Sequence, residues 1–97
     1  MKNYWIVHIS KKKFYIDEDK KKMLMQCLKK EIPFLQINDM LVNPLKFEYL
    51  EHDVAKELVE EYKKTTDEEK KKFLVREMLQ IKDQDRVQML MNASNII

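Results

Sequence analysis

The sequence predicts an α+β fold, with a small antiparallel sheet in the order β-β-α-β-β followed by a C-terminal helical hairpin or three short helices. Aromatic and β-branched residues are dense in 4–16, apolar residues in 17–31 have helical spacing, and the chain after about residue 50 has only helical patterns. We expect one domain over 1–97, with the sheet in 1–50, helices in 51–97 and a frayed tail at 92–97.

Two strands, at 4–9 and 14–16, are predicted to form a hairpin. The segment YWIVHI is rich in strand-favouring residues, and FYI resumes that character after a polar break at 10–13. Neither Asn-Gly nor Asp-Gly marks the turn, so its type stays open.

A helix is predicted over 17–31. Asp17 is a candidate N-cap, and the acidic residues that follow it favour the positive end of the helix dipole. Pro33 ends the helix because it pushes the preceding residue out of the helical region. Cys27 lies on the apolar stripe and is predicted to be a small core residue rather than a nucleophile.

Short strands are predicted on either side of two turns. Segments 34–37 and 40–42 flank Asn38-Asp39, a pair that tolerates left-handed backbone without glycine, and Asn43-Pro44 marks a kink or second turn. Alternation in 45–49 predicts a strand with Leu45, Phe47 and Tyr49 on one face.

The second half is predicted to be helical throughout. Asp53 is a candidate N-cap for the stripe of 54–62, Thr66 with Glu69 fits a capping box, and Asp83 breaks the chain or caps a last helix. The middle helix is expected to bury Phe73, Leu74, Met78, Leu79 and Ile81.

The chain contains no glycine, although about 7% is usual. Phosphate-binding loops need glycine for close backbone approach and for positive φ. The sequence therefore excludes a Walker A loop, a GxGxxG dinucleotide turn and a nucleophile elbow. Without a catalytic set or a metal-binding motif, we expect no enzyme activity, no catalytic residues, no cofactor and no metal.

Charge and cysteine content indicate a soluble, cytoplasmic protein. Charged residues make up 37% of the chain, there is one cysteine, and no apolar run reaches the length of a membrane span. Residues 1–50 hold ten lysines and six acidic residues, whereas 51–97 hold nine basic and eleven acidic residues. This contrast would allow a charged partner or a symmetric homodimer.

Lysine and aromatic residues near the predicted hairpin form the candidate contact surface. Lys11, Lys12 and Lys13 would lie at its tip, next to Trp5 and Tyr15, for a partner or a nucleic acid. The lysine runs 20–22 and 70–72 each follow acidic residues and are expected to be neutralised locally.

Seven methionines are many for this length, and methionine is frequent at adaptable binding surfaces. Met23 and Met25, like Met89 and Met91, are two residues apart, so one of each pair should face outward. Candidate protein contacts are Met25, Met89 and Met91.

The expected function is a small non-enzymatic regulator or inhibitor that binds another protein. Lysine exceeds arginine by 17 to 2, which is typical of an AT-rich genome and suggests a phage or mobile-element accessory protein with an anti-defence or host-directed role. The alternative is a nucleic-acid-binding module that uses the lysine and aromatic hairpin.

Overall fold

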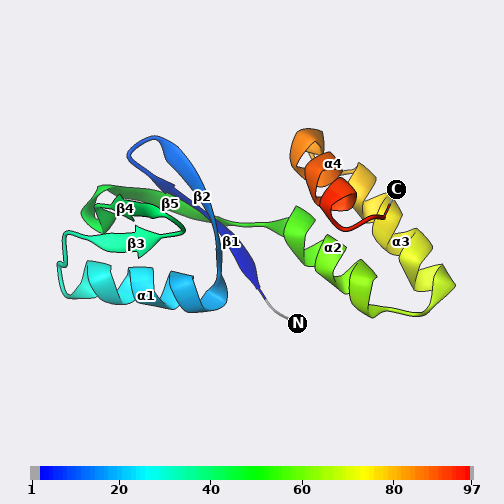
Figure 1. Ribbon diagram of the computed structural model, residues 1–97, viewed down its shortest axis with the longest axis horizontal. Helices are drawn as coiled ribbons and strands as arrows, with labels where there is room; N and C mark the ends of the chain where they lie inside the picture. Colours follow the sequence, from blue (N-terminus) through cyan, green and yellow to red (C-terminus); the bar gives the residue numbers. More distant parts are fainter. Residues whose placement is uncertain (1–2, 97) are drawn as a thin grey trace. The chain divides into compact units, whose positions relative to one another are not determined.

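The computed structural model describes residues 3–96, and their contacts divide the chain at Asp53 into two compact units. Among the described residues, the N-terminal unit contains the strands, one α-helix and a short 3₁₀ helix, and the helical unit contains three α-helices (Figure 1). The α+β prediction is confirmed. A single domain over 1–97 stays a prediction.

A three-stranded antiparallel sheet forms the centre of the N-terminal unit. β1 (Tyr4–Ile9) lies between β2 (Lys12–Asp17) and β5 (Phe47–His52). The β1–β2 hairpin is confirmed, but its turn is only Ser10-Lys11, with φ of 52° and 65°. Two left-handed residues in a two-residue loop are typical of a type I′ turn, which matches the twist of the strands.

The predicted strand at 45–49 is wrong in its start and in its faces. Leu45 belongs to a short 3₁₀ helix, η1 (Pro44–Lys46), which Asn43 caps by accepting a hydrogen bond from the Leu45 N–H. In β5, Phe47 is opposite Ile9 but Tyr49 is opposite His8, because a bulge shifts the register there. Phe47 and Tyr49 therefore lie on opposite faces of the sheet.

Helix α1 (Glu18–Lys29) begins and ends with well-defined caps. The Asp17 carboxylate accepts the Lys20 N–H, as predicted. At the other end Glu31 has a φ of 55°, its N–H bonds to the Leu28 carbonyl, and the next N–H bonds to the Cys27 carbonyl. This is a Schellman motif with glutamate where glycine is usual.

A separate two-stranded ribbon completes the unit, instead of joining the first hairpin in one sheet. β3 (Leu35–Ile37) pairs with β4 (Met40–Val42) around Asn38-Asp39, and Asn38 has the expected positive φ of 53°.

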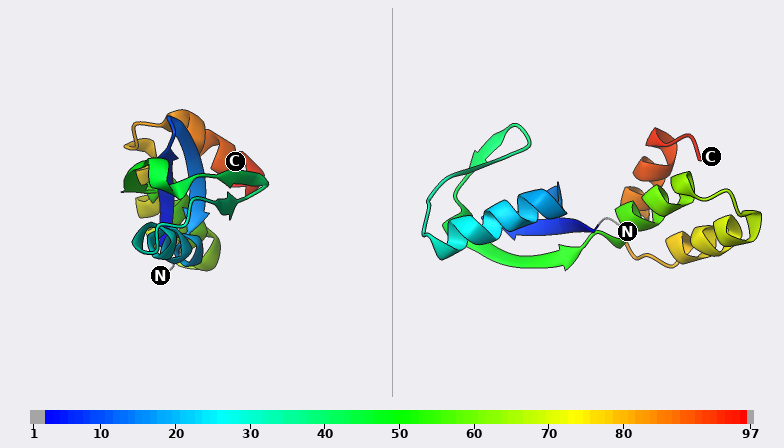
Figure 2. Two further views of the ribbon diagram at one scale, coloured as in Figure 1. Left: turned by 90° about the vertical axis from the view of Figure 1, so that its left-hand side faces the viewer. Right: turned by 90° about the horizontal axis from the view of Figure 1, so that it is seen from below.

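One face of the three-stranded sheet carries the core of the N-terminal unit. This inner face contributes Val7, Ile9, Phe14 and Ile16, which pack with Leu24 and Cys27 of α1 and with the buried residues of β3. The helix lies along that face (Figures 1 and 2). Cys27 is buried in this cluster, as predicted. The opposite, outer face carries the other side chains of each strand.

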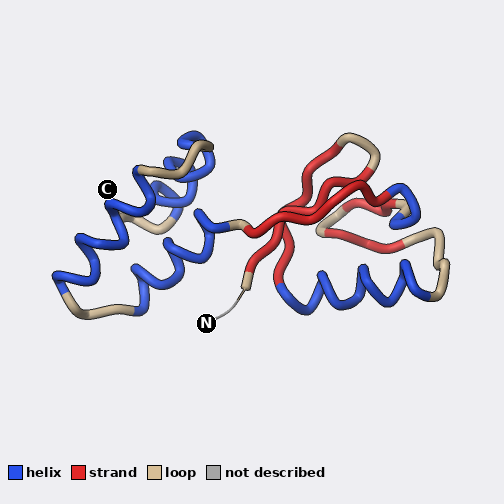
Figure 3. The backbone as a smooth tube through the Cα atoms, turned by 180° about the vertical axis from the view of Figure 1, so that it is seen from behind, coloured by secondary structure: helices blue, strands red, loops and turns tan. Residues whose placement is uncertain are grey.

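The helical unit consists of α2 (Val54–Lys64), α3 (Glu68–Leu79) and α4 (Gln84–Ala93), connected by short loops (Figure 3). Asp83 caps α4 as expected, but α3 is capped by Asp67, which accepts the Glu69 and Lys70 N–H groups, and not by Thr66. The core of the unit is formed by Ala55, Val59, Leu74, Met78, Val87, Leu90 and Met91.

Two expectations for the helical unit differ from the structure. Phe73 and Leu79 are exposed, because the apolar stripe of α3 is narrower than the sequence suggested. Asn92 and Ala93 belong to α4, and Ile96 packs against the core, while Ile97 lies outside the described residues. None of the described helices combines the length and the apolar character that a bilayer span requires.

Candidate functional site

The candidate contact residues on the first hairpin lie on two different faces of the sheet. Trp5 is opposite Ile16 and Tyr15 is opposite Ile6, so Trp5 belongs to the inner face and Tyr15 to the outer face. The structure therefore does not bring Trp5 and Tyr15 together on one stacking surface.

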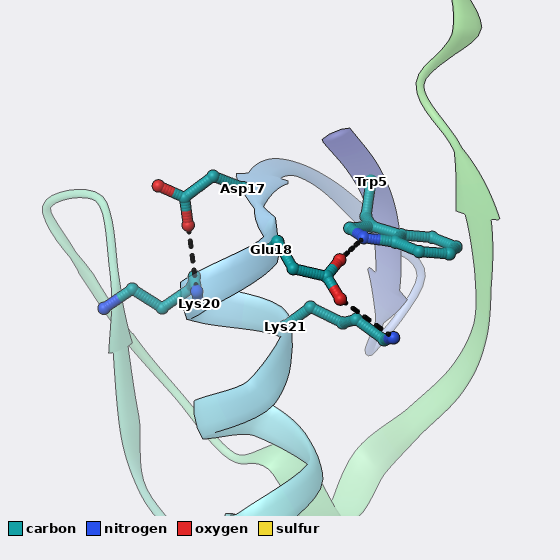
Figure 4. Close-up of polar contacts among 5 residues, drawn as sticks. All are labelled: Trp5, Asp17, Glu18, Lys20 and Lys21. Atoms are coloured by element: carbon teal, nitrogen blue, oxygen red, sulfur yellow. Dashed lines mark hydrogen bonds and ion pairs between the residues drawn. The ribbon is translucent and has the colours of Figure 1, made fainter. Parts of the chain in front are cut away.

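The Trp5 ring has polar neighbours, two of which, Glu18 and Lys21, are drawn in Figure 4. Its indole N–H donates to the Glu18 carboxylate, the Lys21 Nζ lies 4.6 Å from its ring centroid, and the His52 ring centroid lies 4.0 Å away. The Trp5 hydrogen bond is the main reason why the pKa of Glu18 lies below its ordinary value, and Lys21 adds to the effect. Trp5 of β1 is therefore connected to the first turn of α1 by this hydrogen bond.

The three candidate lysines each take a different position around the β1–β2 turn. Lys11 lies in the turn, and its N–H donates to Glu48 over 2.6 Å. Lys12 is opposite Ile9 on the inner face, and Lys13 is opposite His8 on the outer face. All three side chains are exposed.

The β1–β2 turn and α1 both adjoin η1, and in Figure 1 the turn lies at the top and the C-terminal end of α1 at the bottom of the left-hand part of the N-terminal unit. The Ser10 N–H donates to the Lys46 carbonyl, and α1 contacts η1. We call this region around η1 the basic pole. It holds six lysines, namely Lys11, Lys12, Lys13, Lys29, Lys30 and Lys46.

The lysines of the basic pole lack ion-pair partners among the described residues, as do Lys64 and Lys82 of the helical unit. Among residues 3–96, no ion pair involves any of these six lysines. In the helical unit, by contrast, Lys70 lies 2.9 Å from Glu61, and Lys56 lies 3.0 Å from Glu60. Lys71 and Lys72 pair with glutamates as the sequence predicted. None of the six lysines is therefore held in an ion pair with a described residue, although the Glu48 carboxylate lies at the same turn.

A groove of about 180 Å³ opens at the basic pole, between the first hairpin and β4. Its floor includes Ile9, Lys12 and Phe14 from the inner face, and its wall is the strand 40–42. Lys46 lines it as well. Small-molecule sites usually span about 300–1,000 Å³. This groove is better suited to one or two side chains of a peptide.

Apolar side chains are exposed along the segment that forms this wall. Leu41 is 73% exposed and Met40 43%, and Phe34 and Leu45 are exposed nearby in the sequence. Large apolar side chains beside unpaired charges are typical of interaction sites. The basic pole thus combines apolar contact area with lysines that have no ion-pair partner in the described part of the chain.

On the outer face of the sheet, aromatic rings gather around His8. Its ring stacks on Tyr49 with centroids 3.9 Å apart, and its Nε2 lies 3.1 Å from the Glu51 Oε1. Lys13 and Tyr49 occupy the two positions opposite His8. A His-carboxylate pair can orient an imidazole, but among the described residues no Ser, Cys or Thr is in contact with it in the manner of a nucleophile.

The methionine candidates differ in exposure. Met25 and Met89 are exposed, whereas Met91 is buried in the core of the helical unit. One residue of the last pair therefore faces outward, as the spacing predicted, and Met91 offers no contact surface. In the first pair the prediction is wrong, because Met23 and Met25 are both exposed.

Other clusters are weaker candidates. A small pocket of about 110 Å³ lies among Asp17, Glu18 and Asp19, but within the described part of the chain no group of three or more His, Cys, Asp or Glu side chains is arranged to hold a metal ion. A wider hollow between Tyr62 of α2 and helix α3 is lined by Lys71 and Lys72, which are already paired with glutamates.

Sequence reasoning did not single out Met40, Leu41 or Lys46. The signal was present, because three successive apolar residues in a strand cannot all face one core when side chains alternate between faces. In a ribbon of only two strands, such a run must expose apolar surface.

Comparison with known proteins gave no match, whether with protein-family models, with curated proteins or with solved structures.

Proposed function

We propose that the protein is a non-enzymatic binding protein whose basic pole holds an acidic segment of another protein. The observation that carries this proposal is the groove beside β4, where exposed apolar side chains lie next to lysines without ion-pair partners. An acidic segment with apolar side chains would complement both features. Charge complementarity of this kind mainly speeds association and selects the partner.

Capture from a lysate of the native host tests this proposal. The groove variant carries Lys12→Glu and Lys46→Glu, and the control carries Lys64→Glu and Lys82→Glu on the helical unit. All four lysines are exposed and none is in an ion pair with a described residue, so both variants change the net charge equally. Each capture is run with and without nuclease, and captured proteins are compared by mass spectrometry.

The wild type and the control variant are expected to retain the same acidic protein, and the groove variant to lose it. Retention should fall when salt is raised, because exposed charges are screened. Equal retention by all three proteins would refute a role for the basic pole. Loss of capture after nuclease treatment would favour the nucleic-acid alternative.

A nucleic-acid-binding module is the second candidate, and the outer face of the sheet supports it. The stacked rings of His8 and Tyr49 lie beside Lys13, and stacking on aromatic rings is a common mode of single-strand binding. A labelled twelve-nucleotide single strand is expected to bind at low salt, and Tyr49→Ala to weaken it. Absence of salt-sensitive binding would refute this alternative.

The finer parts of the proposal rest on composition. A regulator or inhibitor encoded by a phage or mobile element, acting in the cytoplasm, agrees with the lysine bias and the single cysteine. A homodimer held by charge would need units of opposite net charge. Divided at Asp53, residues 2–53 hold ten lysines and eight acidic residues, and 54–97 hold nine of each sign. Much of the contrast between halves came from Glu51 and Asp53.

A further inference from the structure

We propose that the partner segment binds at the basic pole as an added β-strand, paired in an extended conformation with the open edge of β4. This inference rests on the proposed function and specifies how the segment is held. The occupant is an acidic peptide segment that alternates charged and apolar residues.

The register of the ribbon leaves the backbone of Leu41 pointing away from β3. In a two-residue hairpin the closing pair, here Ile37 and Met40, is hydrogen-bonded, and the pairs then alternate. Gln36 and Leu41 therefore form a non-hydrogen-bonded pair. The Gln36 carbonyl confirms this direction, because it turns outward and accepts the Lys20 Nζ over 3.0 Å.

The Leu41 N–H and carbonyl face the opposite, outer edge of the ribbon. No hydrogen bond from these two groups to another described part of the chain is present outside the ribbon. An unpaired strand edge is a template for another strand.

The groove lies along this edge. Met40, Leu41 and Val42 all line it, although successive side chains of a strand point to opposite faces. Contact with three consecutive residues means that the groove follows the edge of β4 rather than one of its faces. On the hairpin side the groove is lined by Ser10 of the turn and by Ile9, Lys12 and Phe14, which belong to the inner face.

An added strand would thus contact both the backbone of β4 and the side chains that line the groove. Its backbone would bond to the Leu41 N–H and carbonyl, and its alternate apolar side chains would lie over Phe14 and beside Met40. Its acidic side chains would reach Lys12 and Lys46, which line the same groove. Strand addition obtains affinity from the main chain and selectivity from such alternate side-chain sites.

The edge of β4 is suited to a transiently bound peptide rather than to edge-to-edge aggregation of copies of this chain. The strand is three residues long, and Lys46 follows it closely in the chain. Short edges and flanking lysines are features by which proteins limit edge-to-edge aggregation. A second copy of the basic pole would also meet repulsion from its own lysines.

The test uses the full chain and a synthetic eight-residue peptide that alternates aspartate or glutamate with valine or isoleucine. One matched peptide has lysine at the acidic positions, and another carries N-methyl groups on alternate residues along one edge. Affinity is measured by calorimetry. Hydrogen exchange of the Leu41 amide is followed by NMR with and without the acidic peptide.

Two protein variants separate backbone from side-chain effects. Leu41→Pro removes the outward N–H while leaving the β3 ladder intact, since proline is tolerated at strand edges. Leu41→Ala keeps the N–H and removes most of the side chain. Trp5 fluorescence checks that both variants keep the fold of the N-terminal unit.

The acidic peptide is expected to bind the wild type, with slower exchange at Leu41. N-methylation and Leu41→Pro should each weaken binding about tenfold, a typical effect of losing one main-chain hydrogen bond. Leu41→Ala should change affinity less than Leu41→Pro.

Equal binding of the N-methylated peptide would overturn strand addition while leaving an acidic partner in place. Failure of every acidic peptide, together with positive capture from the lysate, would also overturn strand addition but not the proposed function. Equal binding of the lysine peptide, or displacement of the acidic peptide by a single-stranded oligonucleotide at lower concentration, would refute the assignment of an acidic protein segment.

Discussion

Replacing Glu31 with glycine should stabilise the N-terminal unit. Glu31 ends α1 with a φ of 55°, and left-handed backbone costs a residue with a Cβ about 1–2 kcal/mol. Glycine removes that cost but gives the unfolded chain more freedom, which offsets about 0.4–1 kcal/mol. The expected net gain is about 1 kcal/mol, because both hydrogen bonds of the Schellman motif use backbone atoms that the substitution keeps.

Urea unfolding followed by Trp5 fluorescence measures this gain, since Trp5 is the only tryptophan and belongs to the same unit. Glu31→Ala is the matched control, because it removes the same negative charge from the helix C-terminus but keeps a Cβ. We expect the glycine variant to be more stable than the alanine variant by about 1 kcal/mol. Equal stability of the two variants would show that the positive φ carries no strain.

Three further predictions follow from single contacts. Leu24→Ala, at a fully buried site, should destabilise the N-terminal unit by about 2–5 kcal/mol in the same urea assay, and a loss below about 1 kcal/mol would contradict its place in the core. The pKa of Glu18 is lowered in the folded protein, so its ionised carboxylate stabilises the fold at pH values above its ordinary pKa of 4.5. This stabilisation is lost as the pH falls through the lower pKa of the folded state. Glu18→Gln should therefore reduce the difference in urea midpoint between pH 7 and pH 3. Asp67→Ala should cost about 1 kcal/mol in thermal unfolding monitored by circular dichroism, whereas an equal cost for Thr66→Ala would restore Thr66 as the cap of α3.

Local signals predicted most of the elements. Asp17 and Asp83 act on the backbone within one helical turn, so their effects are visible in a short stretch of sequence. The end of α1 was predicted too late, at residue 31, because the left-handed Glu31 ends the helix before Pro33 is reached. The α3 cap was misplaced by one residue because Thr66 and Asp67 are both good caps, and only the observed hydrogen bonds distinguish them.

The sequence did not predict how segments distant along the chain pair and pack with each other. The bulge in β5 depends on how Phe47 and Tyr49 register against β1, and no residue inside β5 signals it. The same holds for the candidate site. Lys12 was visible as part of a charge run, but its proximity to Leu41 and Lys46 arises from the folding of the ribbon toward the inner face of the hairpin.

The central position of β1 has a consequence for synthesis of the chain. The β2 partner of Trp5 is Ile16, which is synthesised soon after it, but the β5 partner is His52, which is synthesised much later. At about 5–20 residues per second, the ribosome needs about 2–7 s more to supply that partner. During this interval the nascent hairpin has an open central edge beside apolar side chains such as Val7. Yield on expression should therefore respond to the rate of translation and to chaperones that protect nascent strands.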